Sequence, residues 1–196
     1  MIVLGLTGSI GMGKTAVARM FNDRGIPVFN ADSAARETLE KSRFIRKALK
    51  REFRAAIRKN ALDRWKLGDI VFADPKKLRR LEALVHPGVM ALLRRFLERQ
   101  RKMKTPLVVV EVPLLFETGL EAVCDKVAVA SAGPHLQRRR VLAREGMSAR
   151  KFEMITNRQI SDALKRKRAD FVIPTSGSKA RTRKAVTRII AALTKS

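Results

Sequence analysis

A glycine-rich stretch near the N-terminus constrains this chain more than any other feature of its sequence. Residues 8–15 read G-S-I-G-M-G-K-T and match the pattern G-x-x-x-x-G-K-[ST] at every fixed position. Glycines permit positive φ angles, so that backbone N–H groups can close around phosphate oxygens. The stretch follows an apolar run at residues 2–6 and opens a helical pattern at residues 15–22, whose N-terminus adds partial positive charge. This order predicts a nucleotide-binding loop, and it argues against the alternative of a glycine-rich turn with an unrelated lysine.

The last two positions of this loop carry the chemistry. Lys14 is placed to reach the β- and γ-phosphates of a nucleotide, and the hydroxyl of Thr15 can ligate Mg²⁺. We therefore expect ATP as co-substrate and Mg²⁺ as cofactor, with Thr15 as the metal ligand. The motif does not indicate which group receives the phosphate.

Five short apolar or β-branched runs, bounded by turn residues, predict buried strands. They lie at residues 2–6, 27–29, 107–112, 126–130 and 171–173. Because helical patterns separate them, we expect an α/β protein with the P-loop NTPase fold, a doubly wound parallel sheet of about five strands. In such sheets ligands bind at the carboxyl ends of the strands.

Two longer intervals interrupt this alternation. Residues 32–104 are mostly helical in pattern and very basic, with Asp74 and Pro75 as a helix start, and they predict a helical substrate-binding insertion. Residues 134–168 predict a helical hairpin that acts as a lid, with Ser148 as the N-cap of its second helix. We expect these intervals to be insertions into a single domain. Its core then comprises residues 1–31, 105–133 and 169–196.

The charge of the chain is strongly unbalanced. It has 196 residues with 43 Lys and Arg against 18 Asp and Glu, a formal net charge of +25. This excludes an acidic disordered chain but leaves nucleic acid and other phosphate-rich partners open. No apolar run approaches the ~20 residues of a membrane span, and no secretory signal is recognisable, so we expect a cytoplasmic protein without membrane contact. A single cysteine and two histidines leave no Cys/His zinc set, and the oligomeric state stays open.

Two acids follow predicted strands and are candidates for phosphate-transfer chemistry. Asp32 can accept a proton from an attacking hydroxyl or hold Mg²⁺ through water, or it can merely cap a helix starting at Ser33. Glu111 can hold the water shell of the metal, or it can be an exposed strand acid. Glu117 is a further candidate in the same region. Position alone leaves these alternatives open.

Several motifs in a fixed order give the chain a resemblance to the dephospho-CoA kinase family. Beside the glycine-rich loop, they are A-D-S-A-A-R at residues 31–36, L-D-R at 62–64, H-P at 86–87, V-P-L-L-F-E at 112–117 and A-D-F-V-I at 169–173. Gln137 and Gln159 also match positions of the family. The loop alone suits very many families, whereas the other motifs in this order are far more specific.

The resemblance implies a P-loop kinase of the nucleoside-monophosphate-kinase type, which phosphorylates the ribose 3′-hydroxyl of dephospho-CoA with ATP. It implies that Asp32 is the catalytic base, that Arg36 and His86 lie near the acceptor, and that Arg140 and Arg144 belong to the lid. Together with Gly8 of the motif, the implied ATP-binding residues are Gly11, Met12, Gly13, Lys14, Thr15 and Ala16.

Other interpretations remain beside this one. A histidine before proline is more often an ordinary helix-end or core residue, and arginine runs are usually solvated. Arg140 and Arg144 are four residues apart and so are expected to share one helix face, where they can grip phosphate oxygens. With Trp65 expected in packing and no tyrosine, the chain lacks stacking platforms, so we expect no specific nucleic-acid partner. The alternative functions are phosphorylation of another nucleotide-like or small hydroxyl acceptor, and a basic P-loop ATPase that binds nucleic acid.

Overall fold

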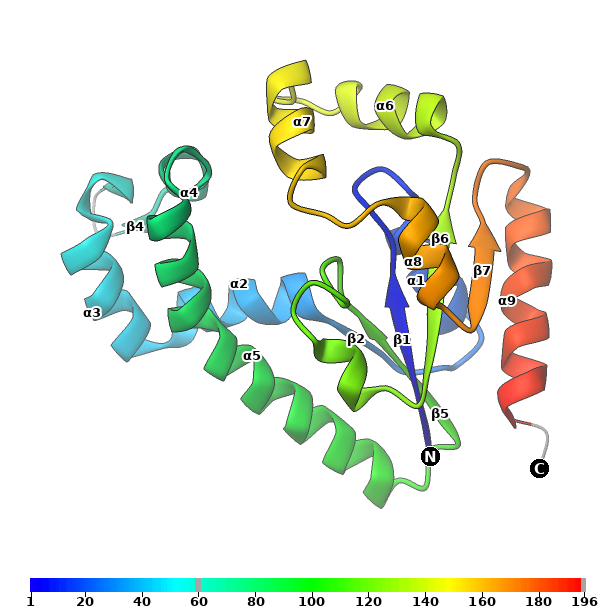
Figure 1. Ribbon diagram of the computed structural model, residues 1–196. Helices are drawn as coiled ribbons and strands as arrows, with labels where there is room; N and C mark the ends of the chain where they lie inside the picture. Colours follow the sequence, from blue (N-terminus) through cyan, green and yellow to red (C-terminus); the bar gives the residue numbers. More distant parts are fainter. Residues whose placement is uncertain (59–60, 195–196) are drawn as a thin grey trace. The chain divides into compact units, whose positions relative to one another are not determined.

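A parallel sheet of five strands forms the centre of the computed structural model, which describes residues 1–58 and 61–194 (Figure 1). The strand order is β2-β5-β1-β6-β7. The strands are β1 (Ile2–Thr7), β2 (Val28–Asn30), β5 (Leu107–Glu111), β6 (Lys126–Ser131) and β7 (Phe171–Pro174). All four pairings between neighbours are parallel. The predicted fold class and all five predicted strands are thus confirmed, with ends that differ by at most one residue.

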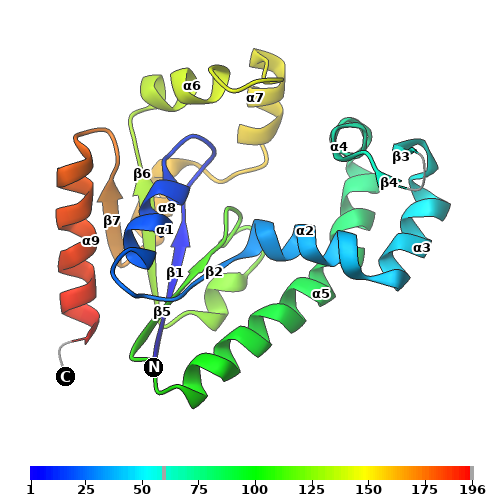
Figure 2. The same cartoon turned by 180° about the vertical axis from the view of Figure 1, so that it is seen from behind.

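The helices of the first compact unit, residues 1–30 and 99–196, cover both faces of this sheet. They are α1 (Lys14–Asn22), α6 (Pro134–Leu142), α7 (Ala149–Thr156), α8 (Asp162–Arg168), α9 (Lys179–Thr194) and the 3₁₀ turn η2 (Leu120–Val123). Figures 1 and 2 show α1 and α9 on one face and α8 over the other. Continuously apolar strands are expected of a sheet covered on both faces. All five residues of β5 are buried accordingly.

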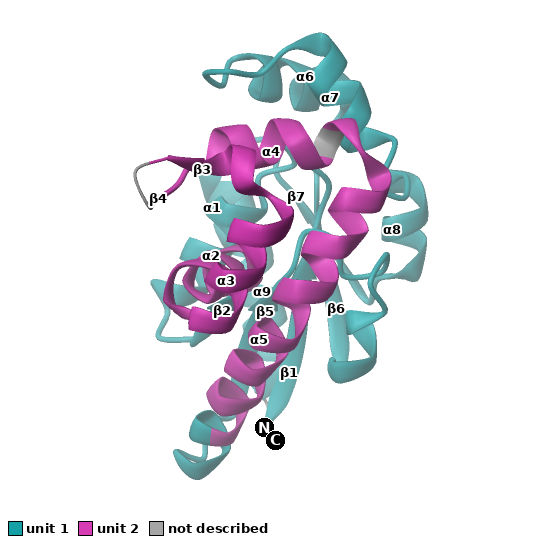
Figure 3. Cartoon of the chain, turned by 90° about the vertical axis from the view of Figure 1, so that its left-hand side faces the viewer, with its two compact units in different colours: residues 1–30, 99–196 teal, residues 31–98 magenta. Residues whose placement is uncertain are grey.

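The second compact unit, residues 31–98, is helical and has its own core (Figure 3). Its elements are α2 (Ala31–Lys41), α3 (Arg43–Glu52), η1 (Arg54–Ala56), β3 (Ile57–Arg58), β4 (Ala61–Leu62), α4 (Arg64–Ala73) and most of α5 (Pro75–Lys102). Ile45, Leu49, Phe53 and Leu67 belong to its buried cluster. The second unit therefore has the apolar interior that allows it to hold its shape.

Several local predictions can be compared with the second unit. Helix α5 begins at Pro75, and the carboxylate of Asp74 accepts hydrogen bonds from the Lys76 and Lys77 amides at 2.9 and 3.3 Å, as expected of a cap. These bonds lower the pKa of Asp74. The expectation that Trp65 is packed is wrong, because 74% of its surface is exposed.

The interval predicted as a hairpin contains three helices, α6, α7 and α8, rather than two. Ser148 caps α7 as predicted, since its side chain accepts a hydrogen bond from the Lys151 amide at 3.2 Å. The third helix, α8, carries the completely buried Lys165. The end of the interval is thus anchored in the first unit, to which it belongs, by a buried side chain.

Candidate functional site

The glycine-rich loop joins β1 to α1, and its backbone requires glycine at several positions. Gly11 and Gly13 have φ angles of +78° and +84°, in the left-handed region that side chains disfavour. At Gly8 the reason is space, because a Cβ there would lie 2.6 Å from the Ala130 carbonyl oxygen. The glycines predicted from the motif therefore shape an open turn that ends at the N-terminus of α1. Ala16 follows in the first turn of α1, where it is exposed.

The side chains of the loop's end meet a buried carboxylate from β5. The Nζ of Lys14 lies 2.7 Å from the Oε1 of Glu111, whose side chain is only 2% exposed. The Thr15 hydroxyl lies 3.5 Å from the same oxygen, and the Asn30 amide donates to the other carboxylate oxygen at 2.5 Å. The alternative of an exposed strand acid is therefore wrong for Glu111. Its carboxylate holds the loop's lysine and hydroxyl at one point, beside the end of β2.

This arrangement brings together what phosphate transfer to or from a nucleotide requires. A lysine, a hydroxyl and a carboxylate lie at the carboxyl ends of β1, β2 and β5, next to a helix N-terminus. The hydroxyl and carboxylate oxygens of Thr15 and Glu111 are hard donors of the kind that Mg²⁺ prefers, and both face the same place. The residues present thus fit a magnesium ion. This fit rests on two side chains, since the described part of the chain contains no group of three or more His, Cys, Asp and Glu side chains that could hold a metal ion.

Two glutamines hold the outer tip of the loop. The Ile10 amide donates to the Oε1 of Gln159 at 3.0 Å, and the Ile10 carbonyl accepts from the Nε2 of Gln137 at 2.8 Å. Gln137 lies on α6, and Gln159 lies between α7 and α8. Both polar backbone groups of one loop residue are therefore satisfied by side chains from the interval predicted as a lid.

Arg140 braces the loop from a third direction. Its guanidinium donates to the Thr175 carbonyl at 2.7 Å and, at a longer 3.4 Å, to the Gly11 carbonyl. The Thr175 hydroxyl in turn donates to the Met12 carbonyl at 2.7 Å. The Met12 side chain is buried, and its sulfur accepts from the Ala132 amide at 3.1 Å. Arg140 is thus engaged with the backbone of the loop and of the segment after β7.

Arg144 lies elsewhere than its spacing from Arg140 predicts. Helix α6 ends at Leu142, so the expectation that both arginines share one helix face is wrong. Arg144 lies in the turn that follows the helix, where it is exposed. Within the part of the chain that the structure describes, its side chain makes no hydrogen bond or ion pair. The two arginines differ accordingly: one is fixed against the loop, and the other is available.

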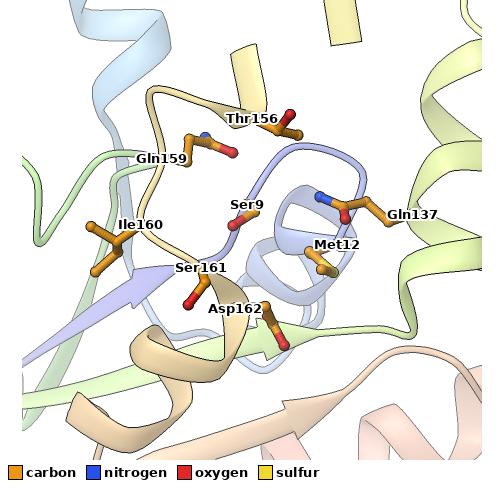
Figure 4. Close-up of a pocket in the computed structure, with 8 residues that line it drawn as sticks. All are labelled: Ser9, Met12, Gln137, Thr156, Gln159, Ile160, Ser161 and Asp162. Carbon is orange, nitrogen blue, oxygen red and sulfur yellow. The ribbon is translucent and has the colours of Figure 1, made fainter. Parts of the chain in front are cut away.

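A small pocket of about 110 Å³ adjoins the loop (Figure 4). The loop, α6 and the segment from the end of α7 to the start of α8 supply its lining, which consists of Ser9, Met12, Gln137, Thr156, Gln159, Ile160, Ser161 and Asp162. Binding pockets for molecules of drug size or larger usually enclose ~300–1,000 Å³. This pocket is therefore too small for a nucleotide.

The three residues expected near the acceptor all lie in the second unit. Asp32 and Arg36 are exposed residues of α2, and His86 is an exposed residue of α5. Helix α2 begins at Ala31, so Asp32 lies in its first turn and is not the cap of a helix that starts at Ser33. The two helices approach closely, since a Cβ on Gly88 would lie 2.3 Å from the Cγ2 of Thr38. Arg36 and His86 each lie two residues before this contact.

Cys124, the single cysteine of the chain, has a thiol that is poorly suited to nucleophilic attack. Burial, together with the nearby Asp125 and Glu121 carboxylates, raises the pKa of its thiol to about 12. A thiol with such a pKa stays protonated near neutral pH and reacts slowly. Cys124 is therefore poorly suited to covalent catalysis.

Sequence reasoning missed the residues that hold the loop from outside. Asn30 and Thr175 carry no motif of their own, and the glutamines matched the family without an assigned role. Each reaches the loop from a segment far away in the sequence, so spacing could not reveal the contact. For Asn30, its place at the end of a predicted strand was the only available signal.

Fold and loop together define the class of the protein. A parallel sheet with the order β2-β5-β1-β6-β7 and a lysine-bearing loop after β1 is that of a P-loop nucleotide-dependent phosphotransferase. Within this class, the chain belongs to the dephospho-CoA kinase family, whose model matches residues 2–181.

Known proteins similar to the chain agree with this assignment. A dephospho-CoA kinase from Brucella melitensis is 44% identical over 98% of this chain and 96% of its own length. The crystal structure of TT1252 from Thermus thermophilus is similar with a TM-score of 0.85 and 38% identity, over 99% of this chain and 98% of that one. The dephospho-CoA kinase from Campylobacter jejuni is similar with a TM-score of 0.67 and 26% identity, over the same shares of the two chains. The similarity extends over essentially the full length of each protein.

Proposed function

We propose that this chain transfers the γ-phosphate of ATP to the ribose 3′-hydroxyl of dephospho-CoA, giving coenzyme A and ADP. The observation that carries the proposal is an intact phosphate-binding loop in a chain that belongs to the dephospho-CoA kinase family over residues 2–181. No described helix is both long enough and apolar enough to cross a membrane. A cytoplasmic location stays a prediction, which cell fractionation would test.

The loop and Lys14 bind the triphosphate in this proposal. Backbone N–H groups of the loop and the N-terminus of α1 face the phosphates, and Lys14 moves from Glu111 to the β- and γ-phosphate oxygens. The short 2.7 Å pair supports this step, because it keeps the ammonium group ordered at the mouth of the loop before nucleotide arrives. Lys14 thus exchanges one anionic partner for another.

Thr15 and Glu111 would hold magnesium, with Glu111 acting directly or through a water molecule. When bound, the ion supplies positive charge to the phosphate oxygens and the ADP leaving group. Asn30 donates to the far oxygen of Glu111 and so keeps the carboxylate oriented while Lys14 leaves it. The buried carboxylate of Glu111 would therefore bind Lys14 before nucleotide arrives and the magnesium ion once nucleotide is bound.

Asp32, Arg36 and His86 serve the acceptor in this proposal. A ribose hydroxyl is a poor nucleophile at neutral pH, and a carboxylate within hydrogen-bond reach can orient it and accept its proton. Asp32 is suited to this role because it is exposed and lies two residues after the end of β2, the strand whose last residue touches Glu111. Arg36 and His86 supply donors for the phosphates or adenine of the acceptor.

The arginines after β6 complete the proposed site. Arg144 contacts the transferred phosphoryl group, because its guanidinium is exposed and unpaired among the described residues. Arg140 comes second, since it already binds the Gly11 and Thr175 carbonyls. In this scheme Arg140 keeps the loop in shape, and the rest of the interval 134–168 closes as a lid over bound phosphates.

A substrate panel tests the proposal directly. Purified protein with ATP and Mg²⁺ is offered dephospho-CoA, adenosine, other nucleotides and small alcohols, and phosphorylation at the 3′-hydroxyl is followed by mass spectrometry and ³¹P NMR. We expect rapid transfer to dephospho-CoA alone. Preferential phosphorylation of another acceptor would identify that compound as the substrate instead of dephospho-CoA. ADP release that depends on DNA or RNA would favour the alternative of a nucleic-acid-binding ATPase.

A further inference from the structure

A largely buried ion pair joins Lys165 to Glu117, and neither residue has a role in the function proposed above. The Nζ of Lys165 on α8 is 2.9 Å from the Oε1 of Glu117, and the two side chains are 0% and 12% exposed. Burying charges costs several kcal/mol per ion unless their geometry and hydrogen bonds compensate. Apolar side chains of similar volume could fill the same space without this cost. The charged pair is therefore expected to hold further groups in place.

The pair fixes the backbone of the segment between α7 and α8. The same Glu117 oxygen accepts a hydrogen bond from the Ile160 amide at 2.9 Å. Lys165 also donates to the Pro113 carbonyl, at 3.1 Å. Because Pro113 and Glu117 both belong to the chain that follows β5, the segment around Ile160 is attached to the carboxyl edge of the sheet.

The residue next to Ile160 touches the nucleotide-binding loop. Gln159 accepts the Ile10 amide at 3.0 Å, and Figure 4 shows its side chain beside the loop. A glutamine has several rotatable bonds, so its amide oxygen stays at this distance only if its own backbone is held. The ordered contacts therefore run from Lys165 through Glu117 and Ile160 to Gln159 and the loop.

We propose that Glu117 is a positioning residue that sets the conformation of the nucleotide-binding loop through Ile160 and Gln159. It touches neither nucleotide nor acceptor in this scheme. It fixes the backbone from which Gln159 reaches the Ile10 amide, and Lys165 compensates its buried charge. This inference rests on the proposed function only in that the loop binds a nucleotide.

Amide hydrogen exchange at Ile10, measured by NMR on the nucleotide-free full chain, tests the proposal independently of catalysis. Gln159→Leu removes the acceptor, and we expect the Ile10 amide to exchange about 5- to 10-fold faster, as for the loss of one hydrogen bond. Glu117→Ala should accelerate the exchange of the Ile10 amide by a similar factor, although the Glu117 side chain does not touch Ile10. The ADP dissociation constant should rise in both variants.

Glu121→Ala is the matched control. Glu121 lies four residues after Glu117 and pairs with Arg168, which is on the same helix as Lys165, but this pair is half-exposed. The control should leave both the exchange of Ile10 and the affinity for ADP unchanged. If Glu117→Ala and Glu121→Ala behaved alike, the effect would be general loosening of α8, and the proposal would be overturned.

A double-mutant cycle decides whether Glu117 acts through Gln159. The double variant Glu117→Ala/Gln159→Leu should bind ADP no more weakly than the weaker single variant, since both changes break one path. Losses that multiply would overturn the proposal. If Glu117→Ala does not fold, Glu117→Gln with Lys165→Met tests the same path in the opposite direction, because that uncharged pair keeps an acceptor for the Ile160 amide. It should keep the Ile10 exchange rate within about twofold, and faster exchange would count against the path.

Absence of dephospho-CoA phosphorylation by the unmodified protein would instead refute the proposed function and leave this test intact.

Discussion

Lys14 and Glu111 form a buried pair in which each side chain depends on the other. Glu111 is 2% exposed, and its two oxygens are shared among Lys14, Thr15 and Asn30. Removing one member of such a pair leaves an uncompensated buried charge, which costs ~3 kcal/mol or more. A variant of either residue therefore changes stability as well as chemistry.

Lys14→Ala should lower turnover by roughly 10²-fold or more, because a preorganised cation that faces the transferred phosphate is lost. It should also lower the melting temperature. The double variant Lys14→Ala/Glu111→Gln should recover stability but not turnover, as measured by thermal denaturation and ADP release. Arg19→Ala, an exposed cation of the same helix, is the control. Near-normal turnover in Lys14→Ala would contradict the assignment of the loop.

Asp32→Asn separates a catalytic base from a helix-stabilising acid. The shape of the side chain is kept and the charge is lost, so we expect unchanged ATP affinity and a drop in turnover of roughly 10²-fold. An acid in the first turn of α2 stabilises the helix by only ~0.3–1 kcal/mol, which would hardly affect turnover. Glu37→Gln on the same helix, which loses the exposed pair with Lys41, is the control. If Asp32→Asn kept its activity, the assignment of Asp32 as the catalytic base would be wrong.

At this scale the sequence predicts residues whose neighbours along the chain determine their role. Lys14 and Thr15 follow from spacing within one loop, and Asp74 and Ser148 follow from local capping rules. Thr175 and Gln159 lie far from the loop in sequence, and only the folded backbone brings them there. For Arg144 a local rule gave a wrong prediction. Its spacing from Arg140 implied a helix that includes both residues, but the helix ends at Leu142, two residues before Arg144.

Helices α2 and α5 cross where a glycine makes close approach possible. A Cβ at Gly88 would lie 2.3 Å from the Cγ2 of the buried Thr38. Thr38 cannot turn away easily, because its hydroxyl donates to the Ala34 carbonyl at 2.7 Å. The usual cost of glycine within a helix is here outweighed by the need for space.

Gly88→Ala should therefore destabilise the protein by about 1–3 kcal/mol, the usual range for overpacking. The second change Thr38→Ala removes the opposing methyl group and should recover part of the loss. Chemical denaturation of both variants provides the measurement. Gly25→Ala tests glycine replacement without a neighbour, since nothing lies within 4 Å there, although its φ of +74° also disfavours alanine. If Thr38→Ala gave no recovery, the close approach would not be the cause.

The interval 134–168 combines segments that are held with segments that are free to respond. Gln137, Arg140 and Lys165 attach α6 and α8 to the rest of the first unit, whereas α7 has no fully buried residue and Arg144 is exposed. We expect bound substrates to slow hydrogen exchange mainly at residues 143–157. Arg144→Ala should lower turnover more than ADP affinity, with Arg150→Ala as an exposed control. Exchange that stayed the same with both substrates bound would argue against a lid.

For the whole molecule, the net charge of +25 is the property that no single site explains. We expect weak, non-specific binding to duplex DNA that falls steeply, by on the order of 10²-fold or more, between 50 and 200 mM salt. Fluorescence anisotropy of a labelled duplex measures this, and ATP turnover measured in parallel should not increase. Binding that resists salt, or turnover that DNA stimulates, would revive the nucleic-acid interpretation.

The strand order has a consequence for how the chain is made. β1 and β2 emerge first, yet they are not neighbours, since β5 lies between them. β2 pairs with β5 alone, and residues 31–106 separate these two strands. During synthesis, therefore, no part of the central sheet can assemble until β5 has left the ribosome. By then the helical unit of residues 31–98, which has its own core, is already complete and can fold first. Once β5 arrives, β1 and β2 can align on its two edges, and the nucleotide-binding loop acquires its shape only as β6, α6 and β7 follow.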